Sequence, residues 1–178
     1  MGKSDLFISN PATLDELMST ALSFGIGYAK SIGAKFGTLV VTIVLNGKQY
    51  LQAESIGGDI ATDYDPIITF DDSPGIVGIN YPAYAAGKAY QSIRTGELSE
   101  EGVALGFGES DSAGSFCATW HYEDPTDKSV TSFFIATSFS GLTSLEDRCV
   151  AECAASGAWY KIIEYQKTLS KKCHLGAH

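Results

Sequence analysis

The chain has 178 residues, of which 44% are hydrophobic, and a formal net charge of -9 at pH 7. This length favours one compact domain with a substantial core and leaves little room for a second. The acidic balance argues against nucleic acids and anionic membranes as partners, because both are recognised through clusters of Lys and Arg.

Targeting signals are absent from the sequence as it stands. The weakly apolar Leu6–Ile8 is too short for a signal peptide, and no apolar stretch is long enough to span a membrane. We therefore expect a cytoplasmic protein with no membrane association and with its four cysteines as free thiols. Residues 1–10 should form a flexible arm, 11–170 a single domain, and 171–178 a flexible tail.

The chain opens with a predicted helix. Thr13 and Glu16 have the spacing of a capping box, which satisfies unpaired groups at a helix start. Apolar residues then recur at helical spacing as far as Ala29, and Gly33 lies near the expected end. This pattern indicates a helix that packs one face against a core.

A β-hairpin should follow this helix. Residues 38–45 are rich in β-branched side chains, and Asn46-Gly47 supplies the positive backbone angles of a type I′ turn before residues 48–56 return. Because the first of these strands is apolar on both faces, we expect it in the middle of a sheet.

Residues 57–82 lack a regular pattern and read as a long loop with partial structure. Its acidic residues do not have the spacing of a calcium-binding loop, so we predict no metal site; they are Asp63, Asp65, Asp71 and Asp72. A second polar connector, residues 97–114, has room for a short helix near 99–104.

A helix is predicted from Pro82 to about Gly96. Its small residues Ala85, Ala86 and Ala89 permit close approach by another element or a ligand. Lys88 lies among them, and its ammonium is able to reach a carboxylate or phosphate. The alternative is a lysine whose ammonium stays in solvent.

The last third predicts a second hairpin and a long helix. Residues 115–122 and 130–139 read as strands, the turn Ser140-Gly141 follows, and a helix should run from Thr143 to about Ser170. Thr143 and Glu146 form a capping box, and Asp147 places negative charge at the positive end of the helix dipole. Together these elements predict an α+β fold: an antiparallel sheet of about five strands with helices packed on it.

Catalytic motifs give no guidance, because the chain lacks a nucleophile elbow, a zinc-protease motif and phosphate-binding loops. His121 lies on a predicted strand. It is a candidate haem ligand or general base, or else a strand histidine bonded to a neighbour.

The segment Thr137 to Asp147 carries a resemblance. Its Ser140-Gly141 turn, five residues before Asp147, resembles the strand–turn–helix signature of the GlcG/HbpS-like family of haem-binding and haem-degradation-associated domains, which includes the PduO C-terminal domain. The N-terminal helix and hairpin, the Ala86-Gly87-Lys88-Ala89 helix and the overall length agree with that family. The resemblance implies a homo-oligomer and haem as a ligand.

We therefore expect a binding protein for haem or a related small anionic molecule. The ligand should lie between Lys88 and the turn of Ser140, Gly141, Leu142 and Thr143, where helix-end N–H groups bind carboxylates. His121 is a further candidate contact. The alternatives are an enzyme acting on a small acid or redox substrate, with His121 or Asp147 as acid–base group, and a purely structural, oligomeric protein.

Overall fold

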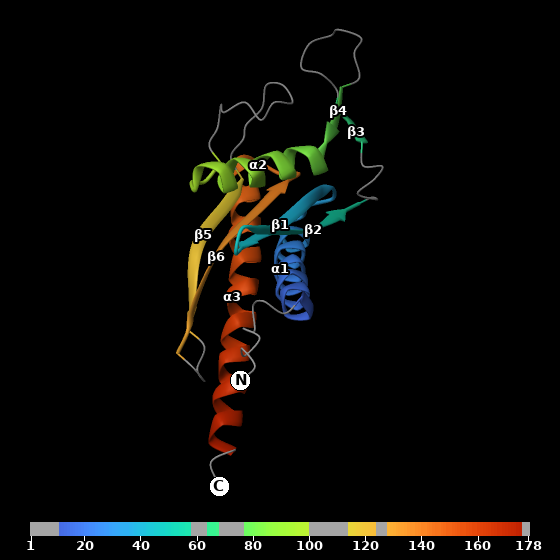
Figure 1. Cartoon of the computed structure of the whole chain (residues 1–178). Coiled ribbons are helices and arrows are strands. Elements are labelled where there is room, and N and C mark those ends of the chain that lie inside the picture. The colour runs from blue at the N-terminus through green and yellow to red at the C-terminus, as the bar shows by residue number, and fades with distance from the viewer. Residues whose placement is uncertain (1–10, 58–63, 68–76, 100–113, 124–127, 176–178) are drawn as a thin grey trace.

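The computed structural model describes residues 11–57, 64–67, 77–99, 114–123 and 128–175. Within them the chain forms three helices, a four-stranded sheet and a separate pair of short strands (Figure 1). The fold class is therefore α+β, as predicted. The elements in chain order are α1 (Pro11–Ser31), β1 (Gly37–Leu45), β2 (Lys48–Ile56), β3 (Tyr64–Ile67), β4 (Val77–Asn80), α2 (Tyr81–Thr95), β5 (Ser115–Glu123), β6 (Val130–Ser140) and α3 (Ser144–Leu175).

The main sheet is antiparallel with the strand order β2-β1-β6-β5. Asn46 and Gly47 join β1 to β2 with φ angles of 51° and 73°, as a type I′ turn requires. β1 pairs with β2 on one side and β6 on the other, so its apolar residues are buried on both faces. The predicted hairpin and the central place of its first strand are both confirmed.

The expected count of about five strands in one sheet is wrong. The described part of the main sheet has four strands, and β3 and β4 form a separate antiparallel pair. Both short strands come from the segment 57–82, which the sequence predicts as a loop with partial structure. Pro66 within β3 cannot donate a backbone hydrogen bond, which suits a short strand outside the main sheet.

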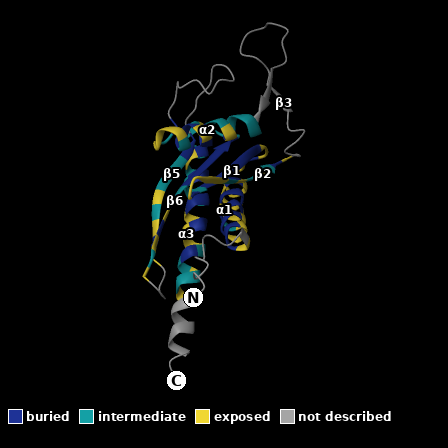
Figure 2. Cartoon of the chain, in the orientation of Figure 1, coloured by how far each residue is buried: buried dark blue, intermediate teal, exposed yellow. Residues whose placement is uncertain are grey.

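Helices cover both faces of the sheet. Successive side chains of a strand point to opposite faces. Leu39, Val41 and Ile43 of β1 join the core beneath α1 and α3, whereas Val40 packs with Ala85 and Ala89 of α2. α2 thus crosses the other face at one end (Figure 1). Figure 2 shows β1, most of β6 and the inner sides of α1 and α3 as the buried centre.

Two helix boundaries differ from the expectation. α1 begins at Pro11, so Thr13 lies inside the first turn and does not cap it. Instead the Tyr165 hydroxyl on α3 donates to Glu16, and Lys161 lies 3.5 Å from the same carboxylate. α3 continues to Leu175, beyond the predicted end near Ser170. No helix among the described residues combines the length and apolar character that a membrane span requires.

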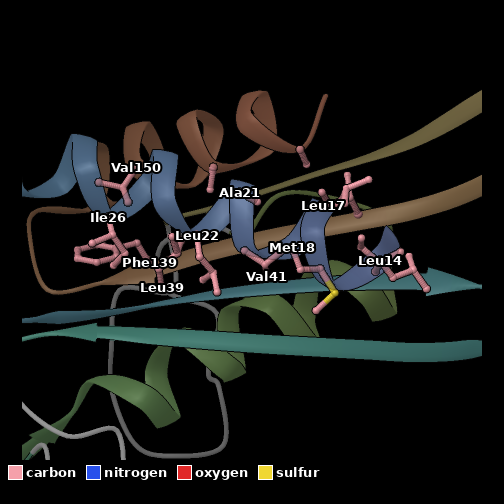
Figure 3. Packing of buried hydrophobic residues seen from close by; sticks show 14 of the residues in the cluster. Leu14, Leu17, Met18, Ala21, Leu22, Ile26, Leu39, Val41, Phe139 and Val150 are labelled. Carbon is pink, nitrogen blue, oxygen red and sulfur yellow. The ribbon is translucent and has the colours of Figure 1, made fainter. Parts of the chain in front are cut away.

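α1 and α3 pack closely through glycine. In Figure 3 the labelled side chains of α1 lie against Leu39, Val41 and Phe139 of the sheet and Val150 of α3. A Cβ atom added at Gly25 would lie 2.5 Å from Leu39 Cδ2 and 2.9 Å from Ala154 Cβ. Gly25 therefore sets how near α1 comes to both the sheet and α3.

We predict opposite effects for two Gly→Ala substitutions in α1. Alanine normally stabilises a helix interior by about 0.5–1 kcal/mol relative to glycine, and nothing lies within 4 Å of a Cβ at Gly27. Gly27→Ala should therefore stabilise the fold, whereas Gly25→Ala should destabilise it by about 1–3 kcal/mol through overpacking. Urea unfolding measures both, and equal gains at the two positions would contradict this packing.

Candidate functional site

The turn between β6 and α3 caps the helix with the chain's own side chains. The Thr143 N–H donates to Glu146 Oε2 (3.2 Å), and the Glu146 N–H donates to Thr143 Oγ1 at 3.5 Å. The predicted capping box is thus present. The Thr143 hydroxyl also donates to Glu146 Oε2 (2.7 Å), and this bond, followed by the one from the Thr143 N–H, lowers the pKa of Glu146.

Asp147 ties the turn to α2. Its Oδ1 accepts a hydrogen bond from the Leu142 N–H (2.9 Å), and its Oδ2 accepts one from Lys88 Nζ (2.8 Å). Lys88 Nζ also donates to the Phe139 carbonyl at the end of β6 (3.0 Å). Both charged side chains are only 4% exposed. One buried ion pair therefore joins α2 to β6 and α3, which come much later in the sequence.

Polar contacts and small residues place α2 for this pairing. Buried Ala85 and Ala89 let the helix lie close to the sheet. The Ser138 hydroxyl on β6 donates to the Ala85 carbonyl (2.5 Å), and the hydroxyls of Ser92 and Ser115 lie 2.7 Å apart. α2 is thereby fixed on β6 and β5, with Lys88 directed at the start of α3.

The backbone of Gly114 closes the space beside the pair. The Gly114 carbonyl accepts from the Phe139 N–H (3.1 Å), and its φ is +117°. A Cβ atom there would lie 2.6 Å from Asp147 Cβ and 3.0 Å from Lys88 Nζ. Any larger residue at this position would push against the ion pair.

Burial dominates the electrostatics of Asp147. Desolvation raises the pKa of its carboxyl to about 6, although Lys88 and the Leu142 N–H act in the opposite direction. The free energy lost when the carboxylate leaves water thus exceeds the stabilisation that Lys88 and the Leu142 N–H provide.

This arrangement bears on the predicted ligand site. Lys88 does lie opposite the turn formed by Ser140, Gly141, Leu142 and Thr143, but it already has a carboxylate partner in Asp147. The N–H groups of Leu142 and Thr143 also donate to carboxylates of the protein. A ligand carboxylate bound here would have to replace Asp147 or Glu146.

His121 lies elsewhere. It is exposed near the end of β5, and its Nδ1 is 2.7 Å from the hydroxyl of Ser132 on β6. This contact fits the alternative of a strand histidine bonded to a neighbour. His121 is far along β5 from Ser115, which contacts α2, so the structure does not bring it together with Lys88.

A groove between β5 and α3 offers a different binding surface. It has a volume of about 390 Å³, within the usual range for small-molecule sites. Trp120 and Trp159 meet edge to face with ring centroids 5.0 Å apart, and 42% of Trp159 is exposed. The described residues lining the groove are Phe116, Trp120, Glu152, Ala155, Ser156 and Trp159.

This groove was not predicted from the sequence, although the residues that line it recur at regular spacing. Phe116 and Trp120 share one face of a strand, and Glu152, Ala155, Ser156 and Trp159 share one face of a helix. Each set alone looks like an ordinary core face. Only the pairing of β5 with β6 and the path of α3 place them together.

Thiols and acidic residues do not form a metal site in the described part of the chain. No group of three or more His, Cys, Asp or Glu side chains is suitably placed there. Asp63, Asp71 and Asp72 of the acidic segment, and most of the short helix expected near 99–104, lie outside the described residues. Cys117, Cys149 and Cys153 are half-buried free thiols, and burial raises the pKa of Cys117 and Cys153.

Comparison with known proteins gives no family assignment. The chain matches no protein-family model and no curated protein sequence.

We predict that Asp147 makes the fold less stable as pH rises. Its folded pKa of about 6 lies above the ordinary value of 3.8. Between these values the native state retains a proton that the unfolded chain has lost, so the contribution of Asp147 to stability is fully present below about pH 4 and is lost as the pH rises through about 6. The difference between these two pKa values corresponds to about 3 kcal/mol.

Unfolding by urea between pH 4 and 7 tests this prediction when wild type is compared with Asp147→Asn. The wild type should lose stability relative to the variant as pH increases. A relative gain over the same range would mean that Lys88 outweighs burial at this site.

Proposed function

We propose that the chain is a small-ligand-binding protein of the GlcG/HbpS-like kind, and that its ligand is a flat, largely apolar molecule of the haem class held in the groove between β5 and α3. The observation that carries the proposal is the pair of indole rings in that groove. A homo-oligomer in the cytoplasm belongs to the same proposal.

The groove suits the faces of a tetrapyrrole. Phe116, Trp120 and Trp159 offer aromatic surface, and the small side chain of Ala155 leaves room between them. Aromatic contacts of this kind contribute about 0.5–1.5 kcal/mol beyond the burial of their area. The exposed face of Trp159 is therefore the natural contact for a planar ring.

Charge at the rim is balanced. Glu152 lines the groove, and its carboxylate accepts a hydrogen bond from Arg148 Nε at 3.0 Å. This pair is exposed and contributes little to stability. Arg148 is thus able to exchange Glu152 for a ligand carboxylate at small cost, which supports a ligand with peripheral acid groups.

The iron of a haem would find no ligand among the described groove residues. None of them is His, Cys, Met or Tyr, and His121 points to the opposite face of β5 from Trp120, its neighbour in the strand. Binding should accordingly depend on the macrocycle and not on the metal.

Tryptophan fluorescence provides the test, because both tryptophans of the chain line the groove. Haemin and iron-free protoporphyrin IX should quench this fluorescence with similar dissociation constants. Trp159→Ala should weaken protoporphyrin binding about tenfold, the equivalent of 1.4 kcal/mol.

Tyr160→Ala is the matched control, and its protoporphyrin binding is measured by the same quenching of Trp120 and Trp159 fluorescence. Tyr160 is 51% exposed and stacks on Phe24, outside the groove. Its loss should leave the affinity unchanged. Absence of saturable quenching, or equal weakening by both substitutions, would refute the groove as the site.

A further inference from the structure

The free edge of β5 has backbone groups that point away from the sheet. β5 is an edge strand, and in the described part of the chain it pairs only with β6. The bond from the Phe139 N–H to the Gly114 carbonyl determines which residues of β5 bond to β6 and which do not. Because bonding alternates along antiparallel strands, the residues whose N–H and C=O groups face outward are Ser115, Cys117, Thr119, His121 and Glu123.

Within its own nine residues, β5 lacks the features that usually prevent strand pairing. Its nine residues pair with β6 in an unbroken register without a bulge. They contain no Pro or Lys, and Glu123 at the very end is the one charged residue among them. The opposite edge, β2, carries Lys48 and Glu54. Long, uncharged edges are prone to pair with another strand.

We propose that β5 pairs antiparallel with β5 of a second copy of this chain, about a two-fold axis at Thr119. In such a pair, residues whose N–H and C=O groups point outward must lie opposite one another. Centring the two-fold axis on Thr119 satisfies this condition and pairs all nine residues of β5. Thr119 then lies opposite the partner's Thr119, and Cys117 opposite the partner's His121. The two sheets become one sheet of eight strands.

Side chains on the α3 face complement each other in this register. Ala118 comes opposite the partner's Trp120, so a small residue meets a large one, and both side chains are only partly buried in the single chain. This surface gives the proposed oligomer an interface, and it does not depend on ligand binding.

Charges on the other face also fit a second copy. Glu97 lies near Cys117, since its charge adds to burial in raising the pKa of that thiol. The partner's His121 arrives opposite Cys117 and so comes beside an acidic group. The two Glu123 side chains lie at opposite ends of the paired strands, about 27 Å apart at 3.4 Å per residue. Like charges are therefore kept apart although the chain is acidic.

Sedimentation equilibrium of the full chain tests the interface. Wild type should have twice the 18.9 kDa mass of the chain. Thr119→Pro should be monomeric, because it removes the Thr119 N–H at the two-fold axis. That N–H does not bond to β6, so the sheet of the single chain keeps its hydrogen bonds. Thr119→Val keeps that N–H and should remain a dimer. A monomeric wild type, or a dimer that survives Thr119→Pro, would overturn the proposal.

A cross-link tests the register without relying on the proline variant. Hydrogen-bonded antiparallel pairs have Cα atoms about 5.5 Å apart, which matches a disulfide. In a chain with its four cysteines replaced by alanine, Thr119→Cys should form a covalent dimer under mild oxidation. Leu51→Cys on the β2 edge, 53% exposed, should not. Equal cross-linking at both sites, or none at Thr119→Cys, would exclude this interface.

Discussion

The buried pair of Lys88 and Asp147 is the interaction on which the arrangement of the elements depends. It joins α2 to the start of α3, and Lys88 also donates a hydrogen bond to the Phe139 carbonyl near the end of β6. Burying two charges is costly unless both find several partners. Phe139 and Leu142 supply those partners, and Gly114 leaves the space that the pair needs.

Much of the fold could be predicted because its signals are local. Asn46-Gly47 determines a hairpin by turn chemistry, and Thr143 with Glu146 marks the start of α3. The number of strands in the sheet could not be predicted in this way. Whether β3 and β4 join the main sheet depends on contacts between distant segments, which neither Pro66 nor the acidic residues around it reveal.

The candidate site could likewise be predicted only where its signals are local. Lys88 and Asp147 are 59 residues apart, and each is visible in the sequence only as a charge in a suitable helix. The sequence therefore indicated where the anion would lie, but not that the protein supplies it from its own chain. Trp120 and Trp159 looked like core residues for the same reason, since α3 places them together across a groove. The aromatic groove is thus a better binding surface than the turn, where the carboxylates of Asp147 and Glu146 already accept from Lys88 and the backbone N–H groups.

A double-mutant cycle at pH 7.5 with Lys88→Met and Asp147→Asn tests the central claim most directly. Asparagine keeps an acceptor for the Leu142 N–H, so the cycle isolates the charge interaction. Lys88→Met should cost about 3–5 kcal/mol, because it leaves the buried Asp147 carboxylate without its partner. Asp147→Asn should cost less, because burial already disfavours the ionised form of that carboxyl. The double variant should be more stable than the sum of the two losses predicts, by about 2 kcal/mol. Losses that add within about 0.5 kcal/mol would contradict a coupled pair.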